Sequence, residues 1–219
     1  SDMGPGTATT MVKIAETSMQ MPAAKIRIML GDTDFPPGPT QGGSTTTSTL
    51  GNGVSLVCDA LKKHLKELAI ANVAVFKAST IDDIEVKDEQ LLSKKDDVIR
   101  ISLGDLVSYS GKEQVEIIQE SGRASAEAQK YAMNSFSAHF VKVHVDPATG
   151  IIKLKKIIAT GDGGKIISEK TARSQMIGGA VGGIGMALTE EVLIDHSTGK
   201  YINDNLGSYH VPLHTDVPH

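Results

Sequence analysis

The stretch that most constrains this fold is residues 36–65, PPGPTQGGSTTTSTLGNGVSLVCDALKKHL. A loop rich in proline and glycine leads there into a pattern of apolar residues at spacings of three and four, with lysines between them. That periodicity predicts a long amphipathic helix from about Thr49. Six consecutive hydroxyl residues, 44–49, stand at its start. The chain must therefore place a polar, glycine-containing loop at the N-terminus of a long helix.

Residues 42–47, the glycine–hydroxyl loop, allow two interpretations. Gly42 and Gly43 permit positive φ and close approach of the backbone to a ligand, and Ser44 and Thr46 are among the hydroxyls that follow. Unpaired N–H groups and the dipole of a helix N-terminus favour negative charge, which predicts a phosphate-binding cradle. An ordinary N-cap needs a hydroxyl but no ligand. Both interpretations remain open from these residues alone, although six poor helix formers exceed what one cap requires.

Composition excludes several classes of protein. The chain has 219 residues, 40% of them hydrophobic and 22% charged, which is ordinary for a globular protein. A net charge of −4, with no basic stretch, argues against nucleic-acid binding. The longest apolar run, 176–188, is shorter than the ~20 residues that span a bilayer. The chain shows no signal peptide and lacks an initiator Met, so we expect a cytoplasmic protein whose sequence starts inside a longer polypeptide.

No cysteine or histidine pattern predicts a metal site. Cys58 is the only cysteine, so this chain alone cannot hold an iron–sulfur cluster or a CxxC zinc site. It lies among apolar residues of the predicted helix, where we expect a buried packing thiol. His139 and His144 are five residues apart on a predicted strand. Their side chains would point to opposite faces, so we expect surface positions.

Local patterns in the first part of the chain predict short elements around the long helix. Apolar spacing and a following proline predict a helix over residues 7–21. Ser102 is a candidate N-cap for a helix over 103–109. Alternation or β-rich composition predicts a hairpin and two further strands: 84–86 with 90–92, 25–30, and 115–118.

The strongest β signal comes later, where residues 140–145 and 151–159 flank the turn sequence DPATG. A helix follows from Ser168 to about Glu191, and its GGAVGGIG segment spaces glycines four apart on one face, which permits close approach of a backbone or a flat ligand. This segment does not match the GxGxxG dinucleotide fingerprint. A second hairpin is predicted over 192–203. Together the patterns predict an α+β fold of two small helix-on-sheet lobes, residues 1–130 and 131–219.

Five motifs carry a family resemblance. They are MGPGT at 3–7, LGDTDFPPGPTQGGSTTTS at 30–48, VKVHVDPATG at 141–150, ARSQMIGGAVGGIGMALTEE at 172–191 and YHVPLHTDVP at 209–218. In order and spacing they resemble the second half of the molybdopterin-binding large subunit of the xanthine dehydrogenase and aldehyde oxidase family. The resemblance covers nearly the whole chain and is loose only in its middle third.

The resemblance implies a set of cofactor-binding residues: Gly4, Gly6, Gly42, Gly43, Ser44, Thr46 and Gln175. The glycine–hydroxyl loop would hold the phosphate end of a molybdopterin, in its mono- or dinucleotide form. Gln175 would hydrogen bond the pterin. The turn 4–6 would touch the cofactor through backbone N–H groups, although Pro5 replaces the family's frequent glutamine and removes one donor.

The resemblance also implies what this chain lacks. The family's catalytic base is a glutamate in a Gly-Glu motif beyond the DVP segment, and Glu190 and Glu191 do not match it. We therefore assign no catalytic residue and expect this chain alone to be inactive and without cofactor. The intact enzyme is expected to be a molybdenum-dependent hydroxylase of an aldehyde or N-heterocycle. Its partners would be the first half of the cofactor-binding subunit, and iron–sulfur and FAD subunits or domains.

An alternative from a different class stands beside this one. A non-enzymatic α+β module could use the glycine–hydroxyl loop to bind a phosphate-bearing ligand or a partner protein. An upstream cofactor-binding half and a downstream Gly-Glu motif would decide for the enzyme.

Overall fold

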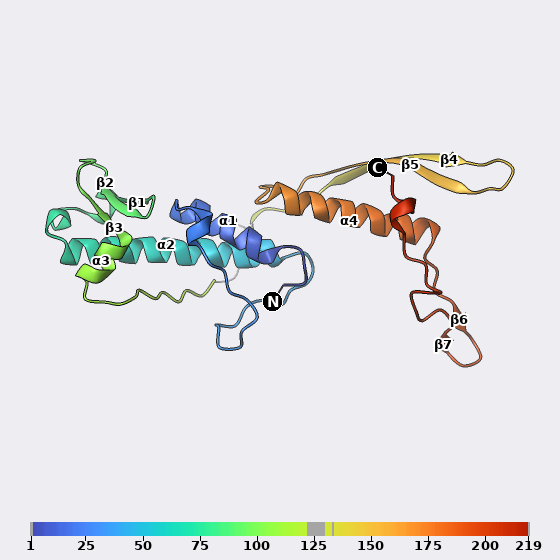
Figure 1. The fold of residues 1–219 in the computed structure, drawn as a ribbon, viewed down its shortest axis with the longest axis horizontal. Helices are drawn as coiled ribbons and strands as arrows, with labels where there is room; N and C mark the ends of the chain where they lie inside the picture. The colour runs from blue at the N-terminus through green and yellow to red at the C-terminus, as the bar shows by residue number, and fades with distance from the viewer. Residues whose placement is uncertain (1, 122–129, 133, 219) are drawn as a thin grey trace. The chain divides into compact units, whose positions relative to one another are not determined.

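The computed structural model of the protein describes residues 2–121, 130–132 and 134–218. The chain forms two compact units, Ser1–Tyr131 and Ala132–His219. Each unit combines helices with antiparallel strands, so the fold is α+β, as the sequence predicted (Figure 1).

The first unit is built on two helices, α1 (Thr7–Met19) and α2 (Thr46–Asn72), which pack against each other. Their apolar faces contribute Ala15, Met19, Cys58 and Leu65 to one buried core. Gly51 of α2 permits this contact, because a Cβ at this position would lie 2.7 Å from Ile14 Cδ1. Cys58 is a free, buried thiol, as predicted, and burial raises its pKa.

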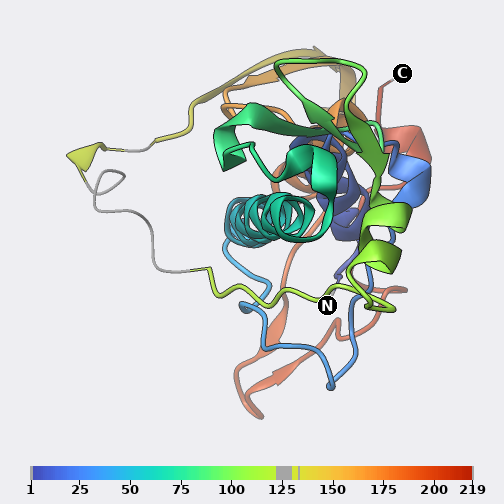
Figure 2. The same cartoon turned by 90° about the vertical axis from the view of Figure 1, so that its left-hand side faces the viewer.

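A three-stranded antiparallel sheet completes this unit (Figure 2). Strand β1 (Ile84–Lys87) turns through Asp88 and Glu89, both at positive φ, into β2 (Gln90–Ser93), and β3 (Arg100–Ser102) pairs with β2. Helix α3 (Leu103–Tyr109) begins at its N-cap Ser102, whose hydroxyl accepts the Asp105 N–H. The predicted hairpin and cap are therefore confirmed. Sheet and helices share a core that includes Phe76, Ile84, Leu91 and Leu106.

Two predicted strands are wrong. Ala23–Lys25 forms a 3₁₀ helix, and the chain then runs to residue 30 without pairing to any strand in the described ranges. Residues 115–118 are likewise unpaired there. Alternation makes a segment compatible with a strand, but a strand also needs a neighbour for its N–H and C=O groups. Short alternating runs do not reveal whether that neighbour exists.

The second unit contains the long hairpin that the sequence predicted, formed by β4 (Ser137–Val145) and β5 (Ile152–Gly161). The register shifts from Lys142↔Lys156 to Val143↔Leu154, so β5 carries one extra residue, a β-bulge. Helix α4 (Glu169–Leu188) contacts β5. The second predicted hairpin is also present, as β6 (Ile194–Asp195) and β7 (Lys200–Tyr201).

Candidate functional site

The glycine–hydroxyl loop passes through two successive left-handed residues before α2 begins. Gly43 has φ 60° and Ser44 has φ 57°. The N–H and the hydroxyl of Thr45 both donate to the carbonyl oxygen of Gly42, at 3.4 and 3.0 Å. A Cβ added to Gly42 or Gly43 would meet no atom within 4 Å. The loop therefore presents bare backbone to open space at the start of the helix.

The six hydroxyls of residues 44–49 divide into two groups. Those of Thr45, Ser48 and Thr49 donate to backbone carbonyls of the loop itself. Those of Ser44, Thr46 and Thr47 have no hydrogen-bond partner among the residues that the structure describes. The N-cap, Thr45, makes no side-chain cap to α2, and the first turn of that helix contains no acidic residue. Three hydroxyls and the first N–H groups of α2 thus remain for an external acceptor.

In the N-terminal turn, residues 4–6, backbone N–H groups find an acceptor within the chain, unlike those at the start of α2. Gly4 and Gly6 both have positive φ, and Gly6 is the N-cap of α1. The Asp2 carboxylate accepts the N–H groups of Gly4 and Thr7, each at 2.9 Å. Hydrogen bonds from Gly4, the largest cause, and from Thr7 lower the pKa of Asp2. Asp2 therefore already occupies the N-terminus of α1, and within this turn only the Gly6 N–H lacks an acceptor in the described part of the chain.

Gln41 links the turn to the glycine–hydroxyl loop. Its Oε1 accepts the Met3 N–H at 2.9 Å, and its Nε2 donates to Thr7 Oγ1 at 2.9 Å. These partners lie 38 and 34 residues away in sequence. The first unit therefore brings together Gly4, Gly6 and the loop, six of the seven residues that the sequence nominated. Sequence reasoning missed Gln41 because a single glutamine in a proline-rich loop belongs to no periodic pattern.

Gln175, the seventh predicted residue, belongs to the second unit. It lies near the start of α4 and is exposed to solvent. Within the described ranges its amide has no hydrogen-bond partner, so nothing there competes with an external ligand. Its predicted contact with the pterin stays a prediction.

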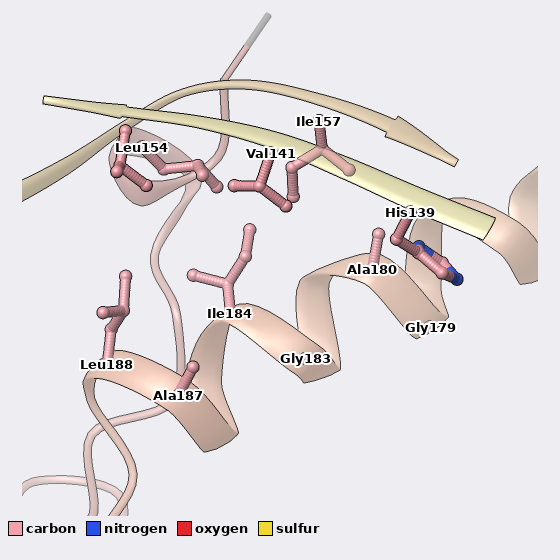
Figure 3. Close-up of a pocket in the computed structure, with 11 residues that line it drawn as sticks. His139, Val141, Leu154, Ile157, Gly179, Ala180, Gly183, Ile184, Ala187 and Leu188 are labelled. Atoms are coloured by element: carbon pink, nitrogen blue, oxygen red, sulfur yellow. The ribbon is translucent and has the colours of Figure 1, made fainter.

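The second unit holds an apolar groove of about 430 Å³ between the β4–β5 hairpin and α4 (Figure 3). Val141, Leu154 and Ile157 line it from the strands, and the bulge in β5 keeps all three on one face. Gly179 and Gly183 line it from α4, and a Cβ on either would meet no atom within 4 Å. The glycine face, which permits close approach of a backbone or a flat ligand, is thus uncovered among the described residues.

Among the described residues of the second unit, no titratable side chain is buried. Of the described residues that line the groove, His139 alone is ionisable, and it is exposed, in line with the expected surface position. Glu190 accepts a hydrogen bond of 2.7 Å from the Tyr209 hydroxyl, which raises the pKa of Tyr209. In the described part of the chain, no group of three or more His, Cys, Asp or Glu side chains could hold a metal ion. None of the helices there is long and apolar enough to cross a membrane.

Comparison with known proteins extends over the whole chain. A family model described as a molybdopterin cofactor-binding domain matches residues 1–218. The aldehyde oxidoreductase molybdenum-binding subunit PaoC of Escherichia coli (strain K12) is 29% identical over 218 residues, 100% of this chain and 28% of that protein. The putative xanthine dehydrogenase molybdenum-binding subunit XdhA of the same strain is 29% identical over 223 residues, 100% of this chain and 29% of that protein.

Solved structures show the same fold. The reconstituted CO dehydrogenase from Oligotropha carboxidovorans superposes with a TM-score of 0.84 at 22% identity, covering 100% of this chain and 27% of that chain. Quinoline 2-oxidoreductase from Pseudomonas putida 86 superposes with a TM-score of 0.79 at 20% identity, covering 100% and 28%. The chain therefore spans less than a third of the length of the proteins that it matches.

Proposed function

Because this chain belongs to the molybdopterin cofactor-binding domains of xanthine dehydrogenase- and aldehyde oxidoreductase-like enzymes, we propose a role for its glycine–hydroxyl loop. The loop would bind the phosphate end of the cofactor. Gly42, Gly43, Ser44 and Thr46 would form this contact. The observation that carries the proposal is the uncapped N-terminus of α2 beside three hydroxyls without partners in the described residues.

The donors present fit a phosphate. A phosphate offers only acceptor oxygens, and this loop offers N–H and O–H donors with no acidic residue in the first helical turn. The left-handed backbone at Gly43 and Ser44 belongs to the kind of concave amide arrangement that binds anions. The open space around the two glycines leaves room for close approach. An N-cap alone would require none of these features.

Other residues of the chain would bind other parts of the cofactor. Gln175 has an amide with both a donor and an acceptor, which suits the edge of a pterin. The Gly6 N–H is the donor that the N-terminal turn retains. When bound, the cofactor supplies the redox chemistry, and these residues bind and orient it.

The reaction that we propose for the intact enzyme is oxidative hydroxylation of an aldehyde or an N-heterocycle, since relatives include an aldehyde oxidoreductase and a putative xanthine dehydrogenase. Cys58 is the chain's only cysteine and is buried in the core. The chain therefore cannot hold an iron–sulfur cluster by itself. Iron–sulfur and FAD subunits or domains, and the remainder of the cofactor-binding subunit, would be its partners, and by itself the chain would be inactive.

The test is Gly43→Val in the intact enzyme. A β-branched side chain disfavours the left-handed conformation that Gly43 adopts and obstructs ligand approach, so molybdenum content should fall to background. Gly38→Val is the matched control, because Gly38 lies in the same connection, has no positive φ and has open space around it. A wild-type molybdenum load in purified Gly43→Val would refute the assignment.

A further inference from the structure

Within residues 27–44 of the connection between α1 and α2, Gln41 alone hydrogen bonds to a distant part of the chain among the residues that the structure describes. Within residues 27–44, every other hydrogen bond in the described structure is local, such as Phe35 N–H to the Asp32 carbonyl. The two Gln41 bonds instead reach Met3 and Thr7, at the start of α1. Much of this connection is exposed, so packing contributes little to its position.

Gln41 is also the residue immediately before the glycine–hydroxyl loop. A flexible loop must be ordered when it binds a ligand, and the free energy of that ordering is subtracted from the affinity. Two hydrogen bonds order the loop in advance: one joins Gln41 to Thr7, which is 4% exposed and part of α1, and the other joins it to the Met3 N–H.

We propose that Gln41 is a positioning residue for phosphate binding, acting by holding the glycine–hydroxyl loop against the first turn of α1. This inference rests on the proposed function of that loop. Gln41 itself does not contact the phosphate. It fixes the place where Ser44, Thr46 and the N-terminus of α2 converge.

An amide suits both partners at this position. The Gln41 Oε1 accepts the Met3 N–H, and the Gln41 Nε2 donates to the Thr7 hydroxyl. The Asp2 carboxylate lies beside Thr7 and accepts its N–H. A glutamate at position 41 could not donate to the Thr7 hydroxyl and would add a second negative charge near Asp2. Glutamine satisfies both partners without charge.

The experiment is a titration of the ¹⁵N-labelled 219-residue chain with inorganic pyrophosphate, following the amide signals of Ser44, Thr46 and Thr47. Gln41→Ala should raise the Kd for pyrophosphate about tenfold, because it removes two hydrogen bonds that pre-order the loop. Gln41→Met preserves side-chain length without these hydrogen bonds and should behave like Gln41→Ala. Thr7→Val removes only one bond and should have a smaller effect, which Thr7→Ser should reverse.

Controls separate positioning from stability. Gln119→Ala truncates an exposed glutamine whose side chain, within the described residues, hydrogen bonds only the neighbouring Glu120 carbonyl, and it should leave the Kd unchanged. A raised Kd in Gln41→Met with an unchanged urea unfolding midpoint supports positioning. An unchanged Kd in both Gln41 variants overturns the inference while leaving the phosphate site intact. Absence of pyrophosphate binding to the wild-type chain overturns the phosphate assignment itself, and the positioning role with it.

Discussion

Gly43→Ala tests how far the backbone of the loop determines its ligand affinity. Gly43 has φ 60°, and a Cβ there would meet no atom within 4 Å. The substitution therefore introduces no clash, and its cost is conformational. A left-handed L-residue costs about 1–2 kcal/mol relative to the right-handed region. That free energy corresponds to a factor of about 5–30 in the population of the native loop.

A smaller population of the native loop weakens ligand binding. Apparent Kd rises in proportion as the binding-competent state becomes rarer, so Gly43→Ala should weaken pyrophosphate binding by about 5–30-fold. The urea unfolding midpoint should hardly change, because the residue is exposed and outside the core. The assay is the pyrophosphate titration of the wild-type and variant chains, with the amide signals of Ser44 and Thr46 as the readout.

Gly42→Ala is the matched control for this prediction. Gly42 is equally open to an added Cβ, but its φ is not positive. Its substitution should leave the loop conformation unchanged, seen as wild-type shifts for Thr45 and Thr46 in the free chain. Ser44→Gly should favour the native loop further, since Ser44 is also left-handed. If Gly43→Ala binds pyrophosphate like the wild type, the left-handed backbone is not what prepares the loop.

Three further predictions concern the rest of the chain. Leu106→Ala, at a residue with 0% exposure, should lower the free energy of unfolding by about 2–5 kcal/mol in urea titrations, whereas Val98→Ala, at 84% exposure, should change it little. Gly53→Ala should raise that free energy by about 1 kcal/mol, because alanine is the better helix former and a Cβ there meets no clash, lying 3.6 Å from Ser121 Cβ. Gly51→Ala should raise it less, because a Cβ there would lie 2.7 Å from Ile14 Cδ1, which must move. Hydrogen bonds from the hydroxyls of Ser197 and Thr198 lower the pKa of Asp195 to about 2. The ionised Asp195 should therefore stabilise the β6–β7 turn fully above the unfolded pKa near 3.8, and this stabilisation should be lost as the pH falls through 2. The carboxyl ¹³C shift of Asp195, followed against pH, is the measurement. An Asp195 titration near its ordinary pKa would contradict the last of these.

Local patterns predicted the elements that depend on local interactions. The helices, the β4–β5 hairpin and the Ser102 cap follow from periodicity, turn residues and a hydroxyl at a helix start. The strand predicted over residues 25–30 was wrong, because a strand needs a pairing partner, and alternation does not reveal whether a distant one exists. Gln41 escaped notice for the same reason, since its partners are 34 and 38 residues away. The nominated loop residues came from glycine and hydroxyl chemistry together with the family resemblance, whereas Gln175 rests on the resemblance alone.

The N-termini of α1 and α2 differ in which groups accept their unpaired N–H groups, and this difference bears on where a phosphate would bind. Each helix start carries a partial positive charge and unpaired N–H groups. At α1, Asp2 supplies a carboxylate that takes the Gly4 and Thr7 N–H groups. At α2, no acidic residue and no side-chain cap takes that role. Because Gln41 joins the two ends through a neutral amide, it adds no charge that would repel an anion, and α2 keeps the stronger attraction for an external phosphate.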